Sequence, residues 1–70
     1  MSETSTIILN GSPHPLPKTI SISALLETLD LAGKPVVVEI DEQAVFPRDY
    51  PNTLVRPGAH VEIVALAAGG

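Results

Sequence analysis

The sequence predicts an α+β domain in which one main helix packs on one face of a mixed sheet of four to five strands. Three observations lead to this prediction. The hydrophobic fraction is 44%, and the branched aliphatic residues that dominate it suit strands. Only one segment has helical periodicity, and short extended segments lie on both sides of it. With 70 residues, the chain should form a single domain over 1–70, with a polar extension at 1–5 and a flexible tail at 67–70.

The first two strands are predicted to form a hairpin. Residues 7–9 are apolar, and the Asn10-Gly11 that follows is the strongest short hairpin signal. The second strand contains three prolines spaced two residues apart: Pro13, Pro15 and Pro17. Their missing N–H groups lie on one side of an extended chain, so we place this strand at an edge of the sheet. A proline-rich recognition segment is the alternative, although the P-x-x-P spacing is absent.

The single helix is predicted to begin after Ser21 and to end near Leu31. Ser21 is a suitable N-terminal cap. Four apolar residues at helical spacing share one face: Ile22, Leu25, Leu26 and Leu29. Gly33 is available as a C-terminal cap, and Pro35 prevents the helix from continuing.

A valine-rich strand at 36–40 follows, and residues 41–43 turn the chain into a short extended piece at 44–46. Three alternate side chains of the strand at 36–40 should face the helix: Val36, Val38 and Ile40. Phe46 and Tyr50 are the only aromatic residues, so we expect the core to consist of isoleucine, valine and leucine.

Residues 47–58 are rich in proline, so they should be mostly loop, with at most a single turn of helix. Arg48, Asp49 and Tyr50 should cap a turn there and stay solvated. In the last strand, 60–66, Val61 and Ile63 alternate with polar residues and should belong to the core.

Composition excludes several classes of function. The net charge is −4 with only four basic residues, which disfavours nucleic-acid binding and suits docking on a basic protein surface. The absence of cysteine excludes disulfides and thiolate metal sites. His14 and His60 are far apart in sequence, so we expect no metal site. No nucleophile, base and orienting group occur together, so we expect no enzyme. Without a signal-peptide or membrane-span pattern, we expect a cytoplasmic protein.

The last residues are the clearest candidate for chemistry. Ala67, Ala68 and Gly69 have small side chains or none, so this segment could thread into the active site of another protein and end at the Gly70 carboxylate. That carboxylate is an anion at neutral pH and a poor electrophile, so ATP would have to activate it. An acyl-adenylate opened by sulfide would give a thiocarboxylate. An ordinary frayed terminus is the alternative.

Several segments of the chain resemble one known family, the sulfur carriers of thiamine biosynthesis. The similar segments are Ile8-Leu9-Asn10-Gly11, residues 21–26, 38–41 and 45–48, residues 57–64, and the final Gly69-Gly70. The resemblance covers about 7–70 and implies a β-grasp fold of the ubiquitin-like type. Two departures are Ala59, where the family usually has aspartate, and Asp41, where it usually has asparagine.

The resemblance also implies partners. An E1-like adenylyltransferase would activate Gly70 with ATP, a sulfur donor such as a cysteine desulfurase would supply sulfur, and thiazole synthase would receive it. The chain would bind no cofactor and would be a monomer when free. Val64 and Leu66 should point outward and could dock these enzymes, or they could be ordinary exposed residues. Alternative functions are the small subunit of molybdopterin synthase, a ubiquitin-like protein modifier, and a non-covalent β-grasp interaction module.

Overall fold

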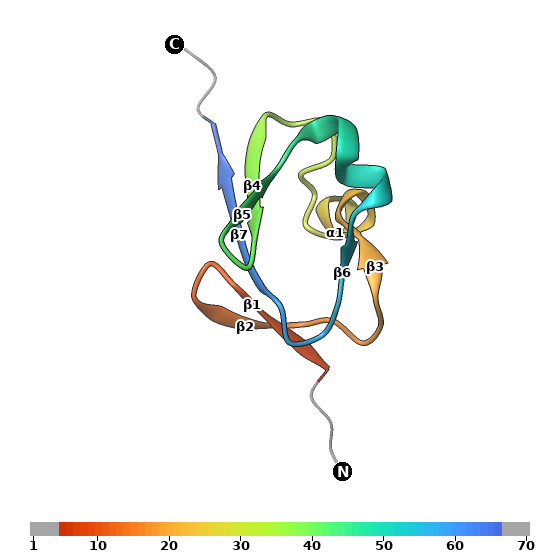
Figure 1. The fold of residues 1–70 in the computed structure, drawn as a ribbon, viewed down its shortest axis with the longest axis vertical. Coiled ribbons are helices and arrows are strands. Elements are labelled where there is room, and N and C mark those ends of the chain that lie inside the picture. Colours follow the sequence, from red (N-terminus) through yellow and green to blue (C-terminus); the bar gives the residue numbers. More distant parts are fainter. Residues whose placement is uncertain (1–4, 67–70) are drawn as a thin grey trace.

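The computed structural model describes residues 5–66, which form two sheets and one α-helix (Figure 1). A five-stranded sheet has the order β2-β1-β7-β4-β5, and a two-stranded sheet pairs β3 with β6. The elements are β1 (Thr6–Leu9), β2 (Ser12–Pro15), β3 (Ile20–Ser21), α1 (Ile22–Thr28), β4 (Val36–Ile40), β5 (Gln43–Val45), the 3-10 helix η1 (Pro47–Asn52), β6 (Leu54–Val55) and β7 (His60–Ala65). The larger sheet is mixed, since β1 and β7 are parallel and its other pairs are antiparallel. The predicted α+β architecture is confirmed.

The β1–β2 hairpin and the edge position of β2 are as predicted. Asn10 and Gly11 both have positive φ angles, 50° and 86°, as a two-residue hairpin turn of this hand requires. The backbone N–H of Leu16 donates to the Ser5 carbonyl at 2.7 Å. Even-numbered residues of this strand therefore turn their N–H groups toward β1, while the positions of the prolines face outward. The outer edge of β2 consequently offers few donors to another strand.

Helix α1 begins where the sequence predicts and ends three residues earlier. The Ser21 side chain accepts a hydrogen bond from the Ala24 N–H at 3.0 Å, which caps the first turn. The last helical residue is Thr28, because Asp30 adopts a left-handed conformation with φ 63°. Leu31 then donates back to the Leu26 carbonyl at 2.8 Å. This closing turn is a Schellman motif built on aspartate, so the prediction that Gly33 ends the helix is wrong.

Strands β4 and β7 are neighbours inside the larger sheet, between β1 and β5. The β4 bounds match the prediction, and Asp41 and Glu42, with φ of 49° and 71°, make the two-residue turn into β5. That turn shifts β5 to Gln43–Val45, one residue before the predicted extended piece. Residues of β4 and β7 pair in register from Val36 opposite Ala65 to Ile40 opposite Val61. Because side chains alternate along strands, this register determines which side chains of β4 and β7 lie together on each face of the sheet.

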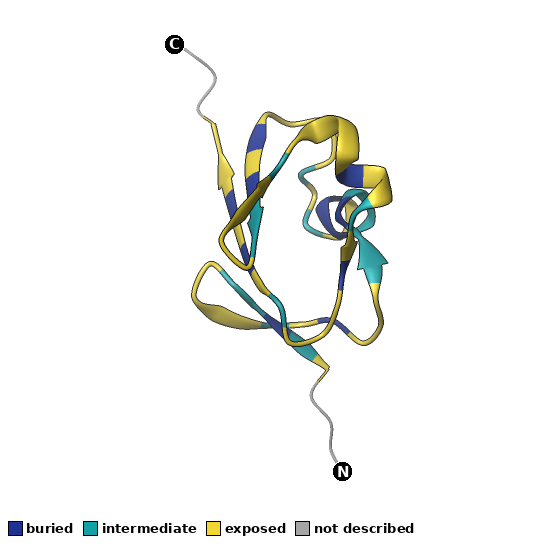
Figure 2. Ribbon diagram, in the orientation of Figure 1, coloured by how far each residue is buried: buried dark blue, intermediate teal, exposed yellow. Residues whose placement is uncertain are grey.

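The buried residues form one core cluster between the larger sheet and α1, and Figure 2 marks the buried positions on these elements. Its members are Ile7, Leu16, Ile22, Leu25, Leu26, Val36, Val38, Tyr50, Val55, Val61 and Ile63. Val36 and Val38 are buried and Ile40 packs against the core, as predicted.

Tyr50 is buried and belongs to the core. Two predictions are therefore wrong: that Tyr50 stays solvated, and that the core contains only aliphatic side chains. The segment 47–58 is also more ordered than expected, since it contains η1 and β6. The Ile22 N–H donates to the Thr53 carbonyl at 2.9 Å, which ties this segment to the start of the helix.

Candidate functional site

Strand β7 leads from the centre of the sheet toward the predicted reactive end of the chain (Figure 1). The last residue that the structure describes is Leu66. The predicted reactive residue Gly70 and the predicted threading residues Ala67, Ala68 and Gly69 lie outside the described residues. Their roles therefore stay predictions. The structure describes the surface around Leu66, the residue that precedes them in the sequence.

Backbone pairing holds β7 along its length and continues to Leu66, the residue after the strand. On one side β7 is antiparallel to β4, and the Leu66 N–H extends this pairing by donating to the Pro35 carbonyl at 2.9 Å. The direction in which the chain leaves the sheet is therefore fixed by β4 as far as Leu66.

On the other side of β7, the side chain of Asn10 takes over where β1 ends. Its Oδ1 accepts from the Ile63 N–H at 2.8 Å, and its Nδ2 donates to the Ile63 carbonyl at 3.0 Å. The Asn10 N–H also donates to the Val61 carbonyl at 2.9 Å. The carboxamide thus replaces a peptide group of a neighbouring strand and satisfies both polar groups of Ile63. The sequence predicts Asn10 only as a turn residue, since nothing in the sequence indicates this partner 53 residues away.

An apolar ridge, defined here as Val37, Phe46 and Val64, crosses the face of the sheet opposite α1. Val37 stands opposite Val64 in the β4–β7 register, and one further step of the β4–β5 register places Phe46 beside Val37. The three side chains are 44%, 60% and 55% exposed in sequence order. The predicted exposure of Val64 is confirmed. Val37 and Phe46 were missed as surface residues, although Val37 lies between two predicted core positions and alternation alone places it outside.

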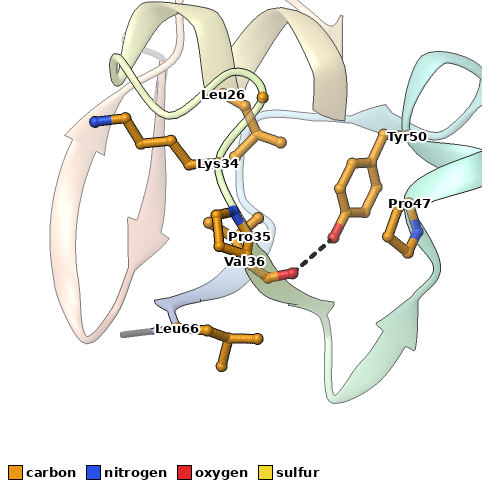
Figure 3. Close-up of a pocket in the computed structure, with 8 residues that line it drawn as sticks. Leu26, Lys34, Pro35, Val36, Pro47, Tyr50 and Leu66 are labelled. Carbon is orange, nitrogen blue, oxygen red and sulfur yellow. Dashed lines mark hydrogen bonds between the residues drawn. The ribbon is translucent and has the colours of Figure 1, made fainter. Parts of the chain in front are cut away.

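Leu66, the second predicted docking residue, is also half exposed. It lies one residue beyond β7 and borders a hollow of about 560 Å³ at the end of the sheet (Figure 3). Leu26, Lys34, Pro35, Val36, Pro47 and Tyr50 are among the other residues that line this hollow. The two predicted docking residues therefore belong to adjoining surfaces rather than to one patch.

Tyr50 closes the inner wall of this hollow, and its hydroxyl donates to the Val36 carbonyl at 3.3 Å (Figure 3). Burial raises the pKa of the Tyr50 phenol above its ordinary value, because the charged phenolate is poorly solvated there. The hydroxyl is therefore protonated at neutral pH. This contact is structural, and it anchors η1 to the start of β4.

Phe46 carries a cation on its ring. The guanidinium carbon of Arg48 lies 5.4 Å from the ring centroid, within the range of a cation–π interaction. At an exposed site such a contact contributes only about 0.5–1 kcal/mol. Its consequence is that the end of the apolar ridge at Phe46 has a positive group beside it.

The other side of the ridge is acidic. Glu39 and Glu62 stand directly opposite each other in the β4–β7 register, on the same face as Val37 and Val64. The remaining register neighbour of Glu39 is Ala44 on β5. None of these neighbours is a lysine or arginine. His60, two residues before Glu62 on β7, lies on the same face as the two carboxylates.

The polar candidate Asp41 has a structural role. The Asp41 Oδ1 accepts from the His60 N–H at 3.0 Å, so Asp41 serves the turn, as predicted. Within residues 5–66 no group of three or more histidine, cysteine, aspartate or glutamate side chains could hold a metal ion. The described part of the chain also contains no helix long and apolar enough to cross a membrane.

Comparisons with known proteins identify what this arrangement is similar to. The model of the ThiS family matches residues 7–70. The sulfur carrier protein ThiS of Thermus thermophilus is 37% identical over 62 residues, which are 89% of this chain and 95% of that protein. The sequence resemblance thus extends over nearly the whole length of both chains.

Solved structures give the same result for the fold. The crystal structure of the thiamine biosynthesis protein ThiS from Geobacter metallireducens superimposes with a TM-score of 0.79 and 25% identity, covering 93% of this chain and 99% of that one. The solution structure from the same organism gives a TM-score of 0.77 and 25% identity over 93% and 87%. The predicted β-grasp fold is therefore confirmed.

Proposed function

Because the chain belongs to the ThiS family, the sulfur carriers of thiamine biosynthesis, we propose that it carries sulfur on its own terminal carboxylate, at Gly70. As a member of this family it is a protein co-substrate rather than a catalyst. The observation that carries the proposal is the family match through Gly70 on a chain without cysteine. With no thiol of its own, the chain would hold sulfur at a carbonyl carbon.

The chemistry follows from the properties of a carboxylate. With an ordinary pKa of about 3.3–3.7, a terminal carboxyl group is an anion at neutral pH and resists attack by a nucleophile. One of its oxygens would attack the α-phosphorus of ATP, and pyrophosphate would leave. Hydrosulfide would then attack the carbonyl carbon of the acyl-adenylate, and AMP would leave with the C–O bonding electrons. The product is a thiocarboxylate whose sulfur can be passed on.

Each step needs a partner. An E1-like adenylyltransferase would bind ATP and Gly70, a sulfur donor such as a cysteine desulfurase would supply the sulfur, and thiazole synthase would accept it. Ala67, Ala68 and Gly69 would occupy the channel into each active site, and Val64 and Leu66 would contact the enzyme surface around it. The need for ATP favours the cytoplasm as the location.

The test is the intact mass of the protein after incubation with an E1-like adenylyltransferase, ATP and a sulfide source. We expect a gain that matches replacement of one oxygen by sulfur. The matched control lacks Gly69 and Gly70 and retains every residue from 5 to 66, so its fold should be unchanged and its mass should stay constant.

Other outcomes would favour the other functions. A much heavier product, joined through a lysine of another protein, would favour a protein modifier. A stable complex with a large synthase subunit would favour the small subunit of molybdopterin synthase. If the mass stays constant with every adenylyltransferase tried, the proposal is wrong and a non-covalent interaction module becomes the better interpretation.

A further inference from the structure

The Asn10-Gly11 turn has a chemical reactivity that its role in the hairpin does not use. An asparagine followed by glycine is especially open to spontaneous deamidation, because glycine has no side chain to hinder attack by its backbone nitrogen on the asparagine carboxamide. In this fold a strand far away in the sequence holds the same carboxamide, since both of its polar atoms form hydrogen bonds with Ile63 on β7. A reactive group and its restraint therefore coincide.

The reaction needs only this turn and water. The backbone nitrogen of Gly11, after losing its proton to solvent, attacks Cγ of Asn10 and closes a succinimide ring. The bond between Cγ and Nδ2 breaks, and Nδ2 takes up a proton and leaves as ammonia. Water then opens the ring at either carbonyl and leaves aspartate or isoaspartate. Both residues of the turn are exposed, so water reaches them.

We propose that Asn10 is a deamidation site, and that the hydrogen bonds to Ile63 hold it unreactive while the turn stays attached to β7. Because Nδ2 is the leaving group, the reaction must break the bond in which Nδ2 donates to the Ile63 carbonyl at 3.0 Å. The backbone N–H of Asn10 adds a further bond, to the Val61 carbonyl at 2.9 Å. This inference goes beyond the proposed function and does not depend on it.

The product would weaken the attachment of β7. Aspartate has no Nδ2, so the Ile63 carbonyl would lose its donor and face a carboxylate oxygen instead. Isoaspartate adds a carbon to the backbone of a turn whose two residues, Asn10 and Gly11, have φ angles of 50° and 86°. Deamidation would therefore loosen the strand that precedes the proposed reactive residue Gly70 in the sequence.

The second two-residue turn of the sheet offers a matched control. Its residues, Asp41 and Glu42, have φ angles of 49° and 71°, close to those of the first turn. Its backbone is also tied to β7, since the Asp41 N–H donates to the His60 carbonyl at 2.7 Å. The two turns differ in the side chain, because Asp41 has one hydrogen bond to β7, from the His60 N–H to Oδ1, whereas Asn10 has two.

The experiment compares the two turns within one protein. Asp41→Asn with Glu42→Gly places a second asparagine–glycine pair in the second turn. The wild type and this double variant are incubated at mildly alkaline pH, in buffer and in concentrated urea. Peptide mapping locates the mass gain of about one dalton that accompanies deamidation. Protection at each position is the rate in urea divided by the rate in buffer.

We expect Asn10 of the wild type to react at least about fivefold more slowly in buffer than in urea, because each hydrogen bond that must break slows the reaction by about two- to twelvefold. In the double variant, protection at position 10 should exceed protection at position 41 by at least about twofold. Asn52 is an internal control, since the β-branched Thr53 that follows it hinders the attack and should keep it the slower site in urea.

A further variant, Asn10→Asp, supplies one product without the reaction. Its midpoint of urea unfolding should fall below that of the wild type, because the Ile63 carbonyl loses its donor. This measurement does not depend on the folding of the double variant. An unchanged midpoint would overturn the inference that deamidation loosens β7.

The remaining outcomes decide the protection. Equal protection at positions 10 and 41 would overturn the inference, because the turn itself, rather than the bonds to Ile63, would then account for the slow reaction. Equal rates for Asn10 in buffer and in urea, or no reaction of Asn10 in urea, would also overturn it. None of these measurements involves an adenylyltransferase or sulfur, so failure here leaves the carrier function standing, and failure of the mass assay for sulfur leaves this inference standing.

Discussion

The two faces of the larger sheet are built from similar side chains, but one face is buried and the other is partly exposed. Under α1, Val38, Val61 and Ile63 are buried, whereas on the opposite face Val37 and Val64 are about half exposed (Figure 2). The same two strands, β4 and β7, supply both sets. Residues of equal hydrophobicity therefore differ in role according to which face alternation gives them.

This difference separates stability from function. The buried face has an apolar partner layer in α1, so its side chains are explained by the removal of apolar surface from water. The open face has no such layer among the described elements, so its apolar side chains lose less of their surface to folding. They are accordingly the residues whose presence calls for a partner outside the chain.

The largest effect should come from truncation on the buried face. Ile63→Ala removes a nearly fully buried side chain and leaves a cavity beside α1, at an expected cost of about 2–5 kcal/mol. Urea unfolding followed by circular dichroism measures this loss. A cost below about 1 kcal/mol would mean that Ile63 is not part of a packed core, and the contrast between the two faces would fail.

The next effect concerns the seam that holds β7 in its register. Asn10→Gly keeps the left-handed turn and removes the two side-chain hydrogen bonds to Ile63. Since a net hydrogen bond contributes about 0.5–1.5 kcal/mol, and these two are only partly buried, we expect a loss of about 1–2 kcal/mol in urea unfolding.

Glu42→Gly is the matched control for Asn10→Gly. Glu42 is also left-handed, with φ 71°, and is an exposed residue of the other two-residue hairpin turn. Its replacement should be neutral or slightly stabilising, because glycine tolerates this conformation best. Equal effects of the two substitutions would show that the Asn10 carboxamide contributes nothing to the position of β7.

Local sequence signals predicted much of the fold. Asn10-Gly11, Ser21 and the valine run at 36–40 each act within a few residues of themselves, so the hairpin, the helix start and β4 were predicted correctly. Asp30 ended the helix early because aspartate can adopt the left-handed conformation that was expected of Gly33. The β3–β6 pair was missed because two-residue strands have too little periodicity to recognise.

The candidate site was predicted less completely, because most of it depends on pairing between strands rather than on local sequence signals. Val64 and Leu66 follow from alternation within one strand, and their exposure was predicted. The neighbours of Val64 depend on the register between β4, β5 and β7, which sequence does not give, so Val37, Phe46 and the Glu39–Glu62 pair became visible only in the structure. Tyr50 was misplaced because its burial depends on packing between η1 and α1.

A smaller effect is expected from the one buried phenol. Tyr50→Phe removes the hydrogen bond to the Val36 carbonyl, which at 3.3 Å is long, and should cost about 0.5–1 kcal/mol. Because folding raises the pKa of Tyr50, the unfolded chain ionises first, and stability falls as the pH rises above about 10. Urea unfolding at neutral and alkaline pH should therefore show a smaller alkaline loss in the variant. An identical alkaline loss in both proteins would contradict the burial of this phenol.

The smallest effect on stability is expected at Val64, the residue next to Ile63, where the largest effect is expected. Val64→Thr keeps the shape and β-branching of the side chain, and position 64 is exposed, so the free energy of unfolding should change by no more than about 0.5 kcal/mol. The hydroxyl nevertheless interrupts the apolar ridge, so binding to the activating enzyme should weaken while urea unfolding stays the same. A loss of stability comparable to that of Ile63→Ala would show that both faces of β7 serve the fold, and the open face would then need no partner to explain it.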